Sequence, residues 1–120
     1  MGSDEMSKKK YHVRRFDEID PVDCPCGKAR RAFAEESERL MSLHRVDISR
    51  DSRKHYHKCM TETYYVLSGA GIMELDDDAV PLEPGISVMI RPGCRHRAIG
   101  DLQILNICIP AFDAGDEFED

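Results

Sequence analysis

Four side chains in this sequence have the types and the spacing needed to hold a metal ion. His55 and His57 are separated by one residue, Glu62 follows them, and His96 comes later, after a Pro-Gly pair. Imidazole nitrogens and carboxylate oxygens bind divalent transition metals. Because alternate side chains of an extended strand share a face, we expect His55 and His57 to enter one cavity. Glu62 at the start of the next strand, and His96 on a separate hairpin, complete a predicted set of four metal ligands.

The competing interpretation is that these four are ordinary polar residues on a surface. A single H-x-H pair is weak support for a metal site. All four candidates, however, lie among short strand-like runs that are bounded by turn signals. That setting favours the metal site.

The spacing of these residues also resembles the first sequence motif of the cupin family, G-x5-H-x-H-x3,4-E-x6-G. His55, His57, Glu62 and Gly69 match this motif, and Ser49 stands in place of its opening glycine. All the ligand positions of the motif are therefore intact.

The second cupin motif, G-x5-P-x-G-x2-H-x3-N, is matched less completely. Gly85, Gly93 and His96 keep its spacing, but Pro92 is displaced by one position and Gly100 replaces the closing asparagine. The resemblance extends from about residue 40 to about residue 110. It implies an all-β fold, a double-stranded β-helix or jelly-roll barrel, that binds a metal through His55, His57, Glu62 and His96.

Three histidines and one glutamate suit Fe, Mn, Ni, Co or Zn as divalent ions, rather than calcium or Cu(I). We therefore expect one divalent transition metal per chain. Four protein ligands on an octahedral ion leave two adjacent positions for water, dioxygen or a bidentate substrate. Such a metal acts as a Lewis acid, orients a chelating substrate or activates dioxygen.

Tyr64 and His44 are the candidate catalytic residues. Tyr64 shares strand parity with Glu62, and His44 shares a face with Val46 and Ile48, so both are predicted to point inward. An inward titratable group can donate or accept a proton. The alternatives are a core aromatic ring and a hydrogen-bonded core histidine.

Charged residues near these positions give no anion-binding group by the same parity argument. Arg45, Arg95 and Arg97 are predicted to point outward, whereas Glu74 is a candidate inward carboxylate. This weakens a sugar-phosphate substrate.

Two function classes remain open. The first is a metal-dependent enzyme for a small chelating organic molecule, an oxygenase or isomerase-like cupin. The second is a non-catalytic cupin that binds or senses a small ligand. The intact ligand set favours the first, because the resemblance implies that storage-type and many regulatory cupins lack intact ligands.

Composition limits the partners and the location. The chain has 120 residues, enough for one domain, with 41% hydrophobic and 33% charged residues, as in ordinary soluble proteins. A net charge of −6 argues against nucleic-acid or anionic-membrane partners. No apolar run approaches the roughly 18 residues of a membrane helix, and no signal peptide is visible. We therefore expect a cytoplasmic protein.

Five cysteines are present, and reduced thiols are the expectation in a cytoplasm. Cys24-Pro25-Cys26 is read as a turn, with a structural or redox role as the alternative. A scaffold centred on this pair is a third, weaker interpretation of function.

The chain divides into a disordered N-terminus (1–10), a cupin domain (11–112) and an acidic, solvated C-terminal tail (113–120). Residues 20–27 are predicted to form a loop. Residues 28–45 are rich in helix formers, but the resemblance implies two strands with a turn near Glu36. An edge strand over 11–16 would favour a homodimer. The further predicted strands are 43–48, 63–67, 72–75, 79–82, 86–90, 96–99 and 102–109. The predicted core residues are Val66, Leu67, Val88, Ile90, Leu105 and Ile107.

Overall fold

The structure, a computed structural model, describes residues 10–36 and 38–120. Within this part of the chain, short 3-10 helices at Phe16–Glu18 (η1) and Ala114–Asp116 (η2) flank a set of strands. The strands are β1 (Val22–Cys24), β2 (Gly27–Ala32), β3 (Ser42–Ile48), β4 (Thr61–Leu75), β5 (Asp78–Leu82), β6 (Ser87–Ile90) and β7 (His96–Ile109). The predicted all-β jelly roll is confirmed.

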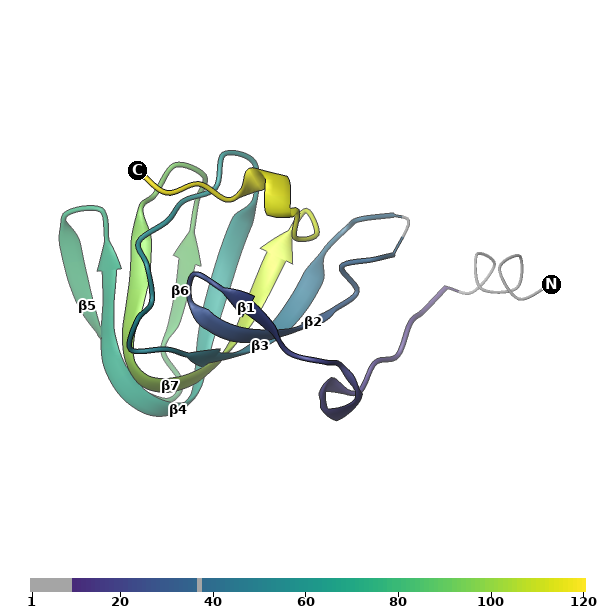
Figure 1. Ribbon diagram of the computed structural model, residues 1–120, viewed down its shortest axis with the longest axis horizontal. Helices are drawn as coiled ribbons and strands as arrows, with labels where there is room; N and C mark the ends of the chain where they lie inside the picture. The colour runs from purple at the N-terminus through teal and green to yellow at the C-terminus, as the bar shows by residue number, and fades with distance from the viewer. Residues whose placement is uncertain (1–9, 37) are drawn as a thin grey trace.

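All strand pairs are antiparallel, and the sheet has the order β1-β2-β3-β7-β4-β5, with β6 paired to β4. Figure 1 shows β4 and β7 curving together round the base of the barrel, so that the sheet folds over on itself. The described residues contain no helix long and apolar enough to cross a membrane.

Glycines permit the bend in β4 and β7. Gly69 has a φ of +90° and Gly100 a φ of +141°. A Cβ at Gly69 would overlap the carbonyl oxygen of Asp101, and a Cβ at Gly100 would lie 2.5 Å from that of Ala70. Only glycine tolerates both the positive φ and this close backbone approach. The bend accounts for a break that the sequence reading placed at residues 100–101, whereas the structure forms one continuous strand.

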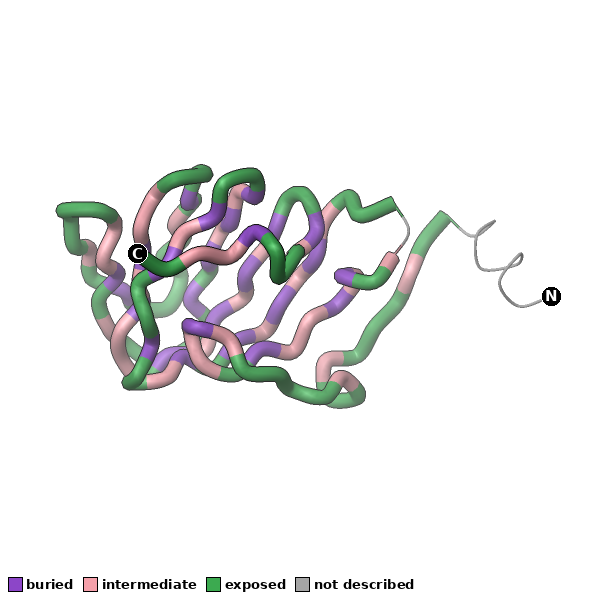
Figure 2. The backbone as a smooth tube through the Cα atoms, turned by 45° about the horizontal axis from the view of Figure 1, so that its top comes forward, coloured by how far each residue is buried: buried purple, intermediate pink, exposed green. Residues whose placement is uncertain are grey.

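Buried and less buried residues alternate along the strands, as Figure 2 shows. The predicted core residues Val66 and Ile90 are buried, and Val88 packs against them. The prediction is wrong for Leu67, which is 37% exposed, and for Leu105 and Ile107, whose strand buries the even-numbered positions instead. A strand that is apolar on both faces hides its alternation, so parity was misassigned there.

The N-terminal predictions are wrong in two places. Residues 11–15 form no strand, and residues 20–27 are not a loop, because β1 and β2 form a hairpin through a turn at Pro25 and Cys26. Residues 28–45 contain most of β2 and the first residues of β3. The two strands implied by the family resemblance are therefore confirmed, and the helix favoured by residue propensity does not form in the described part of this segment. The prediction for residues 1–10 lies outside the described residues except at Lys10.

Candidate metal centre

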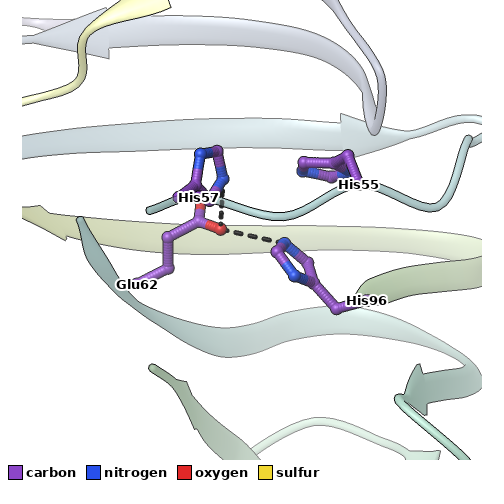
Figure 3. A group of neighbouring side chains, drawn as sticks. All are labelled: His55, His57, Glu62 and His96. Atoms are coloured by element: carbon purple, nitrogen blue, oxygen red, sulfur yellow. Dashed lines mark ion pairs between the residues drawn. The ribbon is translucent and has the colours of Figure 1, made fainter. Parts of the chain in front are cut away.

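The four predicted ligands lie together inside the barrel, as Figure 3 shows. One ligand atom of each residue lies within 4.8 Å of the others. Glu62 Oε1 is 3.0 Å from His57 Nε2 and 2.9 Å from His96 Nε2. None of the four residues is more than 3% exposed. The structure thus brings together every ligand that the sequence predicted.

Backbone pairing places the ligands on converging segments. His55 and His96 form an isolated bridge, in which each amide donates to the other's carbonyl at 3.1 Å and 2.9 Å. The amide of Gly93 donates to the carbonyl of His57 at 2.7 Å. Between the two histidines, Tyr56 stacks on Phe118 and away from the cluster. His55 and His57 therefore point to one side of the segment and Tyr56 to the other, as expected for an extended H-x-H sequence.

The second ring nitrogen of each histidine faces a backbone carbonyl. The Nδ1 atoms of His55, His57 and His96 lie 2.9, 2.6 and 2.9 Å from the carbonyl oxygens of Arg53, Asp116 and Cys94. A carbonyl oxygen only accepts, so each Nδ1 carries a hydrogen and donates it. Each Nε2 then carries a lone pair and faces the cluster, which is the arrangement that metal-binding histidines adopt.

The facing atoms have no hydrogen-bond partners of their own. His57 Nε2, His96 Nε2 and Glu62 Oε1 are buried and unpartnered, although they lie about 3 Å apart. Lone pairs at that distance repel one another unless a positive charge lies between them. Nitrogen and carboxylate donors with these tautomers suit a divalent transition metal. The residues present therefore fit the metal that the sequence predicted.

Asn106 orients the carboxylate, and the sequence reading missed it. Its Nδ2 donates to Glu62 Oε2, which leaves Oε1 to face the histidines. Although burial raises the pKa of Glu62, contacts with His57 and His96 hold that pKa well below its usual range. The available signal was a single asparagine within the otherwise apolar run of residues 104–109.

The two candidate catalytic residues both point inward, as strand parity predicted. His44 is 3% exposed, and its Nε2 lies 2.9 Å from the Ser42 hydroxyl. Burial and the charge of Arg31 lower the pKa of His44 to about 4. Tyr64 is 2% exposed and contacts His96 edge-on, and burial raises its pKa well above the usual value. His44 is thus neutral near pH 7, and Tyr64 keeps its phenolic proton.

The prediction of a solvated C-terminal tail is wrong for residues 116–118, whereas residues 113–115, 119 and 120 are exposed. The Asp116 carboxylate is buried and accepts backbone hydrogen bonds from the amides of Lys58, Cys59 and Met60. Its carbonyl is the acceptor for His57 Nδ1. The acidic composition predicted solvation, but a carboxylate that satisfies several backbone amides is stable when buried. The tail therefore supports one of the ligands directly.

A small cavity of about 10 Å³ adjoins the cluster, room for about one water molecule. Its walls include residues that the sequence reading did not assign to the site. These are Cys24, Cys26, Ala29, Arg31, Asn106, Phe112 and Glu117, beside His44, His55, Glu62 and Tyr64.

Two further predictions from the sequence are wrong. Cys24 and Cys26 are joined in a disulfide, so the expectation of reduced thiols is wrong for this pair. Glu74 points outward, where it pairs with Arg97 at 2.9 Å, so it is not an inward carboxylate. Arg45 and Arg95 do lie outside the cavity, where they pair with Asp17 and Asp120.

Comparison with known proteins places these features in a family. Residues 42–107 match the family described as Cupin domain. No curated protein matches the chain.

Solved structures share the whole fold. A protein from Planctomyces limnophilus is 37% identical, with a TM-score of 0.85 over 91% of this chain and 96% of that chain. Pac13 from Streptomyces, a nucleoside dehydratase, is 20% identical, with a TM-score of 0.76 over 91% and 90%. Ectoine synthase from P. lautus is 18% identical, with a TM-score of 0.72 over 90% and 88%. The last two similarities concern the fold alone.

We predict that the protein binds about one transition metal per chain and that His96→Ala weakens this binding while the fold survives, because the apolar part of the core does not include the ligands. Elemental analysis after reloading with Fe, Mn, Ni, Co or Zn measures the metal, and circular dichroism checks the fold. His12→Ala, a histidine outside the cluster, is the matched control. Sub-stoichiometric metal in the unmodified protein under every loading condition would contradict the prediction.

Metal affinity should fall as pH is lowered. Burial lowers the pKa of His57, but close contact with the Glu62 carboxylate outweighs burial and raises that pKa above its usual value. The metal needs a neutral imidazole, so protons compete for His57 below that raised pKa. Burial and His96 lower the pKa of His55 to about 4, so His55 resists protonation until then. Calorimetric titration between about pH 8 and about pH 5 measures the effect, and a constant affinity would argue against histidine ligation.

Replacing Asn106 with alanine should reduce metal affinity by about 10- to 100-fold, because it frees the Glu62 carboxylate to rotate. Competition with a chelator of known affinity gives the number. Gln103→Ala is the control, since Gln103 lies on the same strand but bonds outward to Asp47. Equal affinities in the two variants would show that Asn106 does not orient the ligand.

Proposed function

This chain belongs to the cupin family, and from that premise we propose that it is a divalent-metal-dependent enzyme acting on a small chelating organic molecule. The observation that carries the proposal is the convergence of three imidazole nitrogens and one carboxylate oxygen at a buried point, with the atoms that face each other lacking partners. Without an ion at this point, a buried proton on one of the imidazoles would be needed to offset that repulsion.

The ligand set accommodates Fe, Mn, Ni, Co or Zn, and the bound ion would supply Lewis-acid polarisation of an oxygen or dioxygen activation. His55, His57, Glu62 and His96 would hold it. The small cavity beside the cluster excludes a polymer, and it limits what reaches the centre to one end of a small molecule.

Tyr64 and His44 are proposed to move protons beside the metal. The raised pKa of Tyr64 keeps its hydroxyl protonated, which suits a hydrogen-bond or proton donor. The lowered pKa of His44 keeps its ring neutral, which suits an acceptor. Both line the cavity that adjoins Glu62.

The reaction type we favour is that of an oxygenase or an isomerase-like cupin. The alternative is a non-catalytic module that binds a small ligand, with the metal as an anchor. Titratable side chains beside the ligands favour the enzyme, because a binding module needs no proton donor there. Enzymes of this fold, such as the nucleoside dehydratase and ectoine synthase described above, also act on small molecules.

Tyr64→Phe and His44→Ala should each lower turnover while metal content stays intact, because neither residue is among the predicted ligands. The assay is a substrate screen with metal-loaded protein under aerobic and anaerobic conditions. Tyr65→Phe, on the opposite face of β4, is the control. Full activity in both variants would exclude them from catalysis. No turnover with any metal would favour the binding module.

We also expect a cytoplasmic homodimer. The proposed strand addition by residues 11–16 loses its support, because residues 11–15 form no strand. An exposed apolar group on β4, β6 and β7, namely Tyr65, Met89 and Ile109, offers a different contact surface. Sedimentation velocity at micromolar protein concentration measures the oligomeric state. Met89→Glu should shift a dimer toward monomer, and a monomeric unmodified protein would remove the proposal.

A further inference from the structure

Arg31 is an unpaired cation at the entrance to the candidate metal centre. It lies on β2 directly opposite His44 of β3. Its guanidinium carbon lies 3.8 Å from the centroid of the Phe112 ring. Among the described residues it makes no hydrogen bond or ion pair, and its buried Nε atom has no partner. Arg31 is only partly buried, but its Nε–H is buried without an acceptor, which is costly and indicates that an anionic ligand completes this site.

Arg31 lies between two cavities and lines both of them. Arg31 and Phe112 line the small cavity that Glu62 and Tyr64 also line. The same pair lines an outer cleft of about 440 Å³. That volume is typical of a small-molecule site, whereas the inner cavity is not. A ligand whose bulk lies in the cleft must therefore pass the guanidinium to present its end to the metal ligands.

The side chains around Arg31 limit the charge that the ligand can carry. Stacking on Phe112 holds the guanidinium plane, so its edge is ready for a planar, bidentate acceptor. Arg39, the other arginine of the cleft, is already bonded to the carbonyls of Ala34 and Phe112. The remaining charged residues of the cleft are acidic: Asp20, Glu35 and Asp113. One available cation among several carboxylates favours a singly charged carboxylate over a phosphate dianion.

Glu117 is the one further carboxylate near Arg31 that needs consideration. It lines the inner cavity and its charge acts on Arg31, but the two side chains do not approach closely enough to form an ion pair. Glu62 is also in this cavity, but it is held by Asn106 and faces the histidines. The guanidinium is therefore available to an incoming ligand.

We infer that Arg31 binds the carboxylate of a small anionic substrate whose other end, bearing an oxygen donor, reaches the metal held by His55, His57, Glu62 and His96. This inference rests on the proposed function and names its substrate class. The substrate is thus a carboxylate with a second oxygen donor.

The test compares binding of the dicarboxylates from oxalate to glutarate with binding of their diamides, which keep the oxygen donors but carry no carboxylate. Calorimetry is done on manganese-loaded and on metal-free protein, after elemental analysis. At least one dicarboxylate should bind the unmodified protein about tenfold or more tightly than its diamide, as expected for a charge-assisted pair. Arg31→Gln should remove this preference without changing manganese content. Arg45→Gln, which removes the same charge from the outer face of β3, should retain it.

The outcomes separate the two proposals. If manganese does not bind but metal-free protein still prefers the carboxylate and loses that preference in Arg31→Gln, the metal-dependent function fails and the Arg31 site stands. If manganese binds but no dicarboxylate is preferred, or if Arg31→Gln keeps the preference, the Arg31 inference is overturned. Tighter binding of inorganic phosphate than of every dicarboxylate, lost in Arg31→Gln, would overturn the carboxylate assignment.

Discussion

The candidate site depends on the folding-over of two paired strands. In the β4–β7 ladder His96 pairs with Leu75, which is 13 residues from Glu62 on the same strand (75 − 62). On a flat strand that separation would be roughly 40 Å. Yet Glu62 Oε1 lies 2.9 Å from His96 Nε2. The bend near Gly69 and Gly100 is therefore a condition for the site, and a side chain at either position would disturb it from a distance.

Within that folded sheet, the histidine nitrogens and the Glu62 oxygen are already oriented toward one point before an ion binds. Backbone carbonyls fix the histidine tautomers, and Asn106 fixes the carboxylate, so the lone pairs converge at one buried point. Such an arrangement is unfavourable by itself, and the strand pairing must enforce it. Preorganisation of this kind lowers the entropy lost on binding, because the ligands need not be gathered.

Much of this was predictable from spacing, since H-x-H, the following glutamate and the later histidine define the cluster without any tertiary information. Local turn chemistry located most of the later strands as well. The rest required partners that are remote in the sequence. In the sequence Arg31 is one of several early basic residues, and only strand pairing places it opposite His44. Asp116 looked like part of a solvated acidic end, because composition does not reveal which backbone amides a carboxylate will meet.

The anchoring of Asp116 makes the C-terminal segment a support of the candidate site. The motif-bearing region ends at residue 107, yet the His57 ring is held by a carbonyl that lies beyond it. Phe118 extends this attachment by bridging to Tyr56 through paired backbone bonds of 3.0 Å. For protein engineering, residues 116–118 are thus part of the support of the candidate metal centre rather than a free attachment point. An affinity tag, fluorophore or fusion partner joined there would disturb the position of the His57 ring.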